Sequence, residues 1–142
     1  MQMVSVHRQL EAPARAVWGL IRQGGGVDRW LPVIASCQLE GSGAGARRVC
    51  TTVHGHVLDE TIEAVDEASR VFQYRIAHVD MLPVADFVGT MHVSDGPGGK
   101  AQVLWIGNFE LRDPGAADAV RAAITEMYGA GLAGLDALAR KG

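Results

Sequence analysis

The chain has 142 residues, a usual length for one domain, so we expect a single domain over residues 1–142. Its 13 Lys and Arg residues against 16 Asp and Glu residues give a net charge of −3, and the basic residues are scattered, so we expect no nucleic-acid partner. There is no apolar run of about 18 residues and no secretion-signal pattern, so we expect a cytoplasmic protein without a membrane span.

The two cysteines, Cys37 and Cys50, are not spaced like the ligands of a metal site. Both lie in apolar segments with strand-like alternation. Free thiols are the usual state of cysteines in a reducing compartment. We therefore expect two free, buried cysteines.

The N-terminal part predicts one strand and two short helices. Alternating residues predict the strand over 3–10. Pro13 suits the first turn of a helix, so a short helix is expected over 13–22, and the glycines at 24–26 end it. A second helical turn is expected at 28–30.

Six further strand segments follow, separated by turns rich in Gly, Asp and Pro. They are residues 34–40, 46–53, 57–65, 71–78, 87–94 and 101–111. A looser segment at 79–85, which contains Pro83, separates the fourth of these from the fifth. Strands at this spacing indicate an antiparallel sheet.

The last part of the chain, 116–140, has the periodicity of a long amphipathic helix. Gly129, Gly131 and Gly134 each weaken it by about 1 kcal/mol relative to Ala, and they permit a close approach to the sheet, a kink, or both. Strands with segregated helices predict an α+β fold. A seven-stranded sheet must curl, and the long helix would fill its concave side.

Several short strings occur in an order that is similar to one known family. They are Trp30-Leu31-Pro32, Ser36-Cys37, Gly43-Ala44-Gly45 leading to Arg48, Glu60 ahead of Val65-Asp66, Phe72-Gln73-Tyr74, Leu82-Pro83-Val84, and Trp105 ahead of Phe109-Glu110. Together with the element order, they resemble the START-like, or Bet v 1-like, superfamily over nearly the whole chain. Within it, the chain looks most like the bacterial polyketide cyclase/dehydrase and lipid-transport (SRPBCC) branch.

This resemblance implies a helix-grip fold with a cavity for a small hydrophobic molecule, such as a lipid, an aromatic compound or a polyketide. In the plant abscisic-acid receptors, which share the fold, two loops close over the ligand, and they match residues 54–56 and 82–84 here. The receptors' ligand-pairing lysine falls at Leu31, and their gate and latch motifs are absent. Hormone reception is therefore not implied, and only the position of the pocket carries over.

The resemblance also implies that the side chain at position 60 points into the cavity, and alternation then selects the inward face of each strand. The expected ligand contacts are Glu60, Arg48, His54, Tyr74, His78, Phe87, Met91, Trp105, Phe109, Ile124 and Tyr128. The same phase turns Leu104 and Ile106 outward. That leaves two interpretations open, a homodimer surface or an incorrect phase on those strands.

Each polar candidate also has a structural interpretation. Glu60 could contact a ligand, act as an acid or base, or pair with Arg48. Arg48 could bind a ligand carboxylate, although pairing with Glu60 is the simpler interpretation. His54 and His78 suit contacts or proton carriers at the cavity mouth, and equally plain rim histidines. Tyr128 could bond a ligand or a strand residue. We expect no metal and no cofactor.

Three functions follow from this pattern. The favoured one is binding of a small hydrophobic molecule in the cavity. The alternative is a polyketide cyclase or dehydratase-type enzyme, for which Glu60 would need a second titratable group within hydrogen-bond reach. A third, a protein-interaction domain, predicts a filled pocket and a large apolar outer patch.

Overall fold

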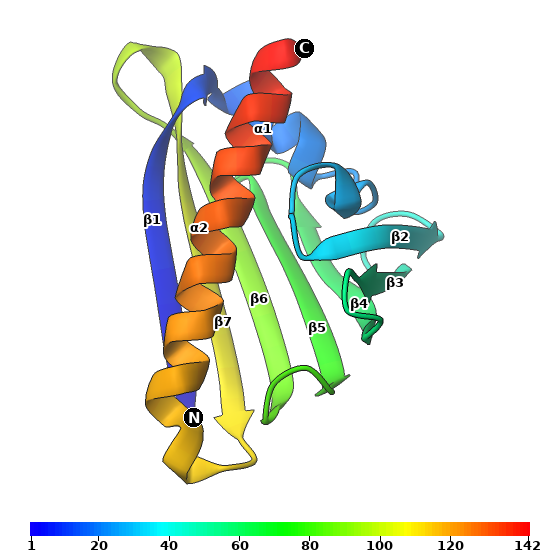
Figure 1. Cartoon of the computed structure of the whole chain (residues 1–142). Coiled ribbons are helices and arrows are strands. Elements are labelled where there is room, and N and C mark those ends of the chain that lie inside the picture. The colour runs from blue at the N-terminus through cyan, green and yellow to red at the C-terminus, as the bar shows by residue number, and fades with distance from the viewer.

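The computed structural model describes all 142 residues and shows one seven-stranded antiparallel sheet, in the order β1-β7-β6-β5-β4-β3-β2 (Figure 1). The strands are β1 (Gln2–Pro13), β2 (Ile34–Glu40), β3 (Arg47–Thr52), β4 (Val57–Asp66), β5 (Val71–Val79), β6 (Val84–Asp95) and β7 (Lys100–Leu111). Strands β2 to β7 form a meander, and β1 adds to its far edge beside β7. The predicted antiparallel sheet is confirmed.

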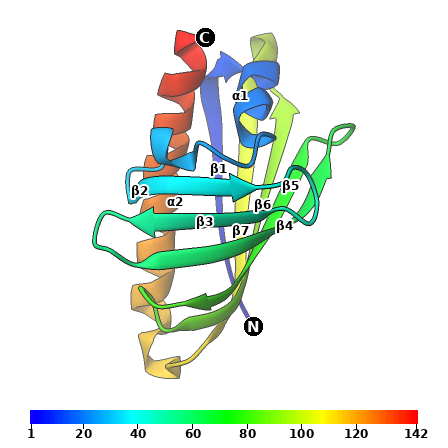
Figure 2. The same cartoon turned by 90° about the vertical axis from the view of Figure 1, so that its right-hand side faces the viewer.

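Both helices and the helical turn that the sequence predicts are present, and two further 3-10 turns were not predicted. The helical elements are α1 (Ala14–Ile21), the 3-10 turns η1 (Val27–Arg29), η2 (Pro97–Gly99) and η3 (Pro114–Ala116), and α2 (Ala117–Lys141). Helix α2 crosses the concave side of the sheet (Figure 1), while β2, β3 and β4 swing across in front of it (Figure 2). The α+β helix-grip fold is confirmed. Two boundaries are wrong. Strand β1 continues to Pro13, where the first helix was expected to begin, and β6 begins at Val84, inside the segment 79–85 that was predicted to be a loose connection.

The predicted inward face of the strands is confirmed most clearly on β7. Its buried residues are Ala101, Val103, Trp105, Gly107 and Phe109. Leu104 and Ile106 lie between them, face away from α2 and are partly exposed. The phase of this strand is therefore correct, and the homodimer surface stays a prediction.

Two glycines let α2 pack closely against the segment that precedes β2. A Cβ atom at Gly134 would lie 2.0 Å from the carbonyl oxygen of Trp30, so no larger residue fits there without displacing the backbone. A Cβ atom at Gly131 would lie 2.8 Å from Leu31 and 3.0 Å from Trp105. The close approach that the glycines predicted is thus real, and it brings Trp30 and Leu31 against the helix.

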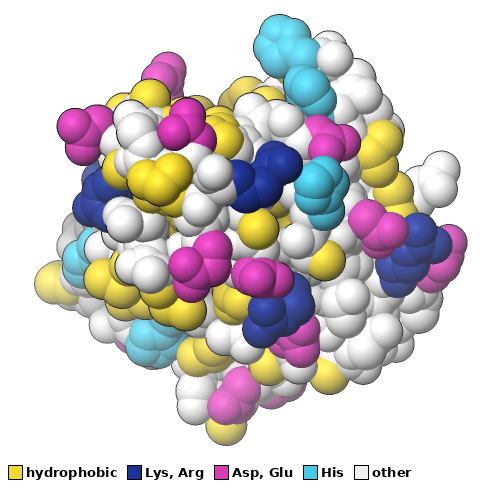
Figure 3. Space-filling model, turned by 90° about the horizontal axis from the view of Figure 1, so that it is seen from below, with side chains coloured by type: hydrophobic (Ala, Val, Ile, Leu, Met, Phe, Trp, Pro, Cys, Tyr) yellow, Lys and Arg dark blue, Asp and Glu magenta, His cyan; other side chains and the backbone are white.

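The surface carries charges of both signs. On the face shown in Figure 3, basic and acidic side chains lie beside one another and form no single basic area. None of the helices combines the length and the apolar character needed to cross a bilayer.

Cys37 and Cys50 form a disulfide, so the prediction of two free thiols is wrong. The β2–β3 register places them directly opposite each other, with their Cα atoms 4.1 Å apart. Alternation alone describes each cysteine on its own strand, and only the hairpin register shows that the two meet. Because disulfides persist mainly in oxidising compartments, the cytoplasmic location loses the support of free thiols and stays a prediction.

Arg112, which follows β7, holds the connection between β5 and β6. Its guanidinium donates hydrogen bonds to the carbonyl oxygens of Val79 (2.8 Å), Leu82 (3.1 Å) and Val84 (3.1 Å). Its backbone N–H donates to the carbonyl of Pro83 at 2.8 Å. One residue therefore donates to four backbone acceptors in and beside this turn.

We predict that Arg112→Gln loosens this turn, because hydrogen bonds from a charged donor each contribute about 2 kcal/mol. Backbone amides at residues 79–84 should exchange with deuterium faster, and the free energy of unfolding should fall. The matched control is Arg75→Gln, which removes an exposed pair with Glu63 at 3.0 Å and should cost under about 1 kcal/mol. Equal effects of the two substitutions would contradict the role of Arg112.

Candidate functional site

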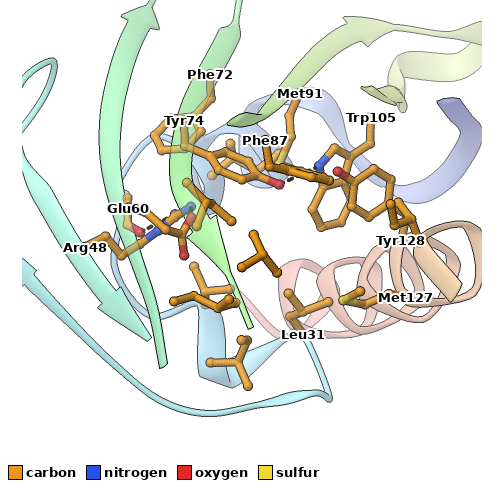
Figure 4. A pocket seen from close by; sticks show the side chains of 18 of the residues that line it. Leu31, Arg48, Glu60, Phe72, Tyr74, Phe87, Met91, Trp105, Met127 and Tyr128 are labelled. Atoms are coloured by element: carbon orange, nitrogen blue, oxygen red, sulfur yellow. Dashed lines mark hydrogen bonds and ion pairs between the residues drawn. The ribbon is translucent and has the colours of Figure 1, made fainter. Parts of the chain in front are cut away.

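A cavity lies between the sheet, α2 and the α1–η1 segment. Its volume is about 80 Å³. One water molecule needs roughly 10–15 Å³ of such space, so the cavity has room for several waters or a small organic molecule. Of its 24 lining residues, 20 are hydrophobic. Figure 4 shows Arg48 and Glu60 on one side of this space and Met127 and Tyr128 on the opposite side. The cavity is therefore apolar, with its two charged groups gathered at one end.

Arg48 and Glu60 form a buried ion pair at that end. They face each other in the β3–β4 register, and Arg48 Nη2 lies 2.7 Å from Glu60 Oε1. Arg48 Nη1 donates to the carbonyl oxygen of Gly24 at 2.8 Å, and the guanidinium carbon lies 5.0 Å from the centre of the Tyr74 ring. The side chains are only 6% and 5% exposed. The predicted pairing of Arg48 with Glu60 is what the structure shows.

The two oxygens of Glu60 differ in their surroundings. Oε1 accepts the bond from Arg48, whereas Oε2 has no hydrogen-bond partner in the protein. Burial raises the pKa of Glu60, because the charged form loses its hydration, and the neighbouring Arg48 opposes that rise. The carboxyl group is thus a partly satisfied polar group on the wall of an apolar space.

Three aromatic side chains, Tyr74, Trp105 and Tyr128, continue the wall from the ion pair to α2. Trp105 Nε1 donates to the hydroxyl of Tyr74 at 3.2 Å, and the Trp105 and Tyr128 rings stack with centroids 3.9 Å apart. Burial raises the pKa of Tyr74 to about 12 and that of Tyr128 well above its usual value. Both hydroxyls therefore stay neutral at physiological pH.

A glycine pair makes room for these rings. Gly89 on β6 lies opposite Gly107 on β7. A Cβ atom at Gly89 would lie 2.0 Å from Tyr74 Cζ, and one at Gly107 would lie 2.9 Å from the Tyr128 hydroxyl oxygen. The sheet is therefore bare of side chains where the two tyrosines lie.

Eight of the eleven predicted ligand contacts line the cavity. They are Glu60, Arg48, Tyr74, Phe87, Met91, Trp105, Ile124 and Tyr128. Phe109 is fully buried behind this layer, stacked on Phe87 with the centroids 5.7 Å apart. The structure does not bring His54 or His78 to the cavity, because both are exposed, and His78 Nε2 lies 2.7 Å from Asp80. No three His, Cys, Asp or Glu side chains come together as a metal site.

Alternation along strands could not find the lining residues that come from other elements. Leu20 and Ile21 of α1 line the cavity, as do Val27, Leu31 and the turn residue Met81. The apolar face of the first helix was the one available signal, since it already contained Leu20 and Ile21. Nothing in the sequence pattern says that this face meets the cavity rather than solid core.

The cavity adjoins a second, outer hollow of about 300 Å³ between α2 and the segments before β2 and β6. Leu31, Met81, Leu82 and Met127 line both spaces, and we call these four residues the seam. The predicted mouth at residues 82–84 adjoins the seam. The other predicted mouth, at 54–56, lines neither space.

The raised pKa of Glu60 makes a stability prediction. A carboxyl group whose pKa is higher in the folded state contributes stability that is present at low pH and lost as the pH rises from about 4.5 through the folded pKa. The unfolding free energies of the wild type and of Glu60→Gln should be measured from pH 4 to pH 8. As the pH rises, the wild type should lose stability relative to Glu60→Gln.

The neighbouring Asp59 is the matched control, because its exposed carboxyl pairs with Arg47, which lowers its pKa. Relative to Asp59→Asn, the wild type should lose stability as the pH falls, which is the opposite pH dependence. The effect should be smaller, because the Asp59–Arg47 pair is exposed. Parallel slopes for the two variants would contradict the effect of burial on Glu60.

Comparison with known proteins agrees with this architecture. A family model described as polyketide cyclase / dehydrase and lipid transport matches residues 1–140. A search of curated proteins finds no significant sequence match.

Solved structures with the same fold come from bacteria and plants. The protein XoxI from Bacillus cereus has a TM-score of 0.85 and 24% identity, covering 97% of this chain and 95% of that one. Truncated norcoclaurine synthase from Thalictrum flavum has a TM-score of 0.78 and 18% identity, covering 96% and 92%. Major latex-like protein 151 from Panax ginseng has a TM-score of 0.77 and 17% identity, covering 96% and 95%.

At these identities the solved structures establish the fold alone, which is Bet v 1-like. The family match spans nearly the whole sequence. The chain therefore belongs to the polyketide cyclase/dehydrase and lipid-transport family.

Proposed function

We propose that this protein binds a small hydrophobic molecule in the cavity between its sheet and α2. The observation that carries the proposal is the unfilled, apolar space itself, in which 20 of 24 lining residues are hydrophobic. Well-packed cores keep few voids larger than a water molecule, so an apolar space of this size is available for a ligand. Burial of apolar ligand surface contributes about 25 cal/mol per Å².

Relatives of the fold support a ligand of modest size. A solved structure of norcoclaurine synthase is a complex with dopamine and hydroxybenzaldehyde, which are single-ring molecules. The inner cavity, at about 80 Å³, is smaller than a cavity of about 150 Å³ that holds benzene, so a molecule of that scale would displace the seam or extend past it into the outer hollow. A protein-interaction domain is less well supported, because the exposed large hydrophobic residues are only Met1, Met3, Val53 and Val57.

We predict that ethylbenzene binds the wild type and raises its unfolding temperature. A ligand at a hundred times its Kd adds about 2.7 kcal/mol to the free energy of unfolding. Leu31→Trp should abolish this shift, because the larger ring would fill the space that Leu31 shares between the cavity and the outer hollow. Val57→Trp, at an exposed position away from the cavity, is the control and should keep the shift. A wild type that shows no shift, and that carries no co-purified molecule by native mass spectrometry, would overturn the proposal.

Proton-transfer catalysis is the second candidate, and the surroundings of the Glu60 carboxyl group favour it. Its Oε2 atom has no partner in the protein, and burial raises its pKa, as a general acid or base requires. Its one side-chain partner is Arg48, which stays protonated and is unsuited to exchange a proton. This arrangement supports binding better than catalysis.

Deuterium exchange separates the two candidates. If Glu60 moves protons, a molecule that co-purifies with the protein should gain deuterium at carbon when incubated with the wild type in D₂O, and not with Glu60→Gln. If the protein only binds, the molecule should be released unchanged from both. Incorporation at the same rate with both variants would exclude Glu60 as the proton carrier.

A further inference from the structure

Glu60 and Arg48 are the only charged residues that line the cavity, and they neutralise each other. Arg48 uses two of its five N–H donors, one on the carbonyl of Gly24 and one on Glu60, and its Nε–H has no partner and is fully buried. Its guanidinium also lies between 5.0 and 5.5 Å from the rings of Tyr74 and Phe72. The charge of Arg48 is nevertheless already balanced by that of Glu60, so a ligand carboxylate would compete with Glu60 for it.

Glu60 Oε2 is the acceptor atom of this pair that has no hydrogen-bond partner. A carboxylate has about four acceptor positions on its two oxygens, and Oε1 is the one that Arg48 occupies. The Glu60 carboxyl lies at the edge of the open space (Figure 4). An acceptor in that position calls for a hydrogen-bond donor on the ligand.

The charge of the pair limits the ligand further. A second carboxylate beside Glu60 would face like charge in an apolar space. An ammonium group would bring in a second positive charge, although Arg48 already balances the negative charge of Glu60, and an unpaired buried charge is costly. A neutral O–H or N–H group meets neither penalty.

The two tyrosine hydroxyls are the other polar groups of this part of the wall. The Tyr74 hydroxyl accepts the bond from Trp105, and the Tyr128 hydroxyl has no hydrogen-bond partner but is fully buried against Gly107. The apolar remainder of the lining would hold the rest of the molecule.

We propose that the ligand is a neutral apolar molecule with one hydroxyl or N–H donor, which it directs at Glu60 Oε2, and that carboxylic acids such as fatty acids are disfavoured. This inference rests on the proposed binding function and names the class of molecule bound.

Four single-ring probes of similar size test it: ethylbenzene, 4-ethylphenol, 4-ethylanisole and 4-ethylbenzoate. Dissociation constants are measured at pH 7 by amide chemical shifts. In the wild type, 4-ethylphenol should bind about tenfold more tightly than 4-ethylanisole, which has the same oxygen without the donor. The benzoate should bind most weakly. Tightest binding by the benzoate, or equal binding by the phenol and the anisole, would overturn the inference.

Two variants test whether the donor group of the ligand bonds to Glu60. Arg48→Met with Glu60→Leu replaces the pair by apolar side chains of similar size, a change that is often neutral for stability. It should keep ethylbenzene binding and lose the preference for the phenol. In Glu60→Gln, Arg48 should hold the amide oxygen and leave the NH₂ group toward the cavity, so the phenol should keep an advantage of about twofold or less. A full preference for the phenol in the double variant would place the hydroxyl elsewhere and refute the assignment.

The ethylbenzene result separates the two levels of the argument. If ethylbenzene binds the wild type and the phenol gains nothing, the ligand class is wrong and the cavity still binds. If none of the four probes binds, the proposed function fails and the ligand class fails with it.

Discussion

The architecture depends on one constraint, which is that a single helix must cover the concave face of a seven-stranded sheet. Helix α2 meets this constraint unevenly along its length. At Gly131 and Gly134, small residues let it pack directly on Leu31 and the carbonyl of Trp30. One to two turns earlier, Ile124 and Tyr128 line open space instead. The alternation of close contact and separation along the same helix is what leaves a cavity in an otherwise filled core.

The buried ion pair is better understood through this cavity than through stability. Removing two charges from water costs several kcal/mol for each ion, and apolar replacements of such pairs are often as stable. Arg48 and Glu60 meet by register, since they lie opposite each other on β3 and β4. What the pair adds to the cavity is one carboxyl oxygen without a protein partner, in surroundings where nearly every other group is apolar.

The sequence predicted the fold and the strand phase well, because both follow from alternation and element order. The resemblance implied that Glu60 points inward, and the apolar phase of the neighbouring strands then selected Tyr74, Met91 and Trp105 correctly. The errors share a cause, which is that they needed contacts between elements that alternation does not describe. The disulfide needed the β2–β3 register, and the exposure of His78 needed the course of the chain at the end of β5, where it meets Asp80.

Because alternation does not describe contacts between elements, the prediction also missed some of the residues that line the cavity. Leu20 and Leu31 come from helical or irregular segments, which have no inward and outward phase of period two. Their place at the cavity follows from the close packing of α2, which no local pattern contains. Arg112 likewise reads as one more surface arginine, because its partners are backbone carbonyls that carry no mark in the sequence.

The seam has a consequence for timing. Its four side chains, Leu31, Met81, Leu82 and Met127, separate an inner volume of about 80 Å³ from an outer one of about 300 Å³. Met81 and Leu82 belong to the turn that Arg112 holds by its carbonyls, so the room that these side chains leave for a crossing molecule depends on how firmly that turn is held. Loop openings of this kind take nanoseconds to milliseconds. The residence time of a bound molecule would then be governed by a backbone motion outside the cavity, and two ligands of unequal affinity could share the same limit on how fast they enter.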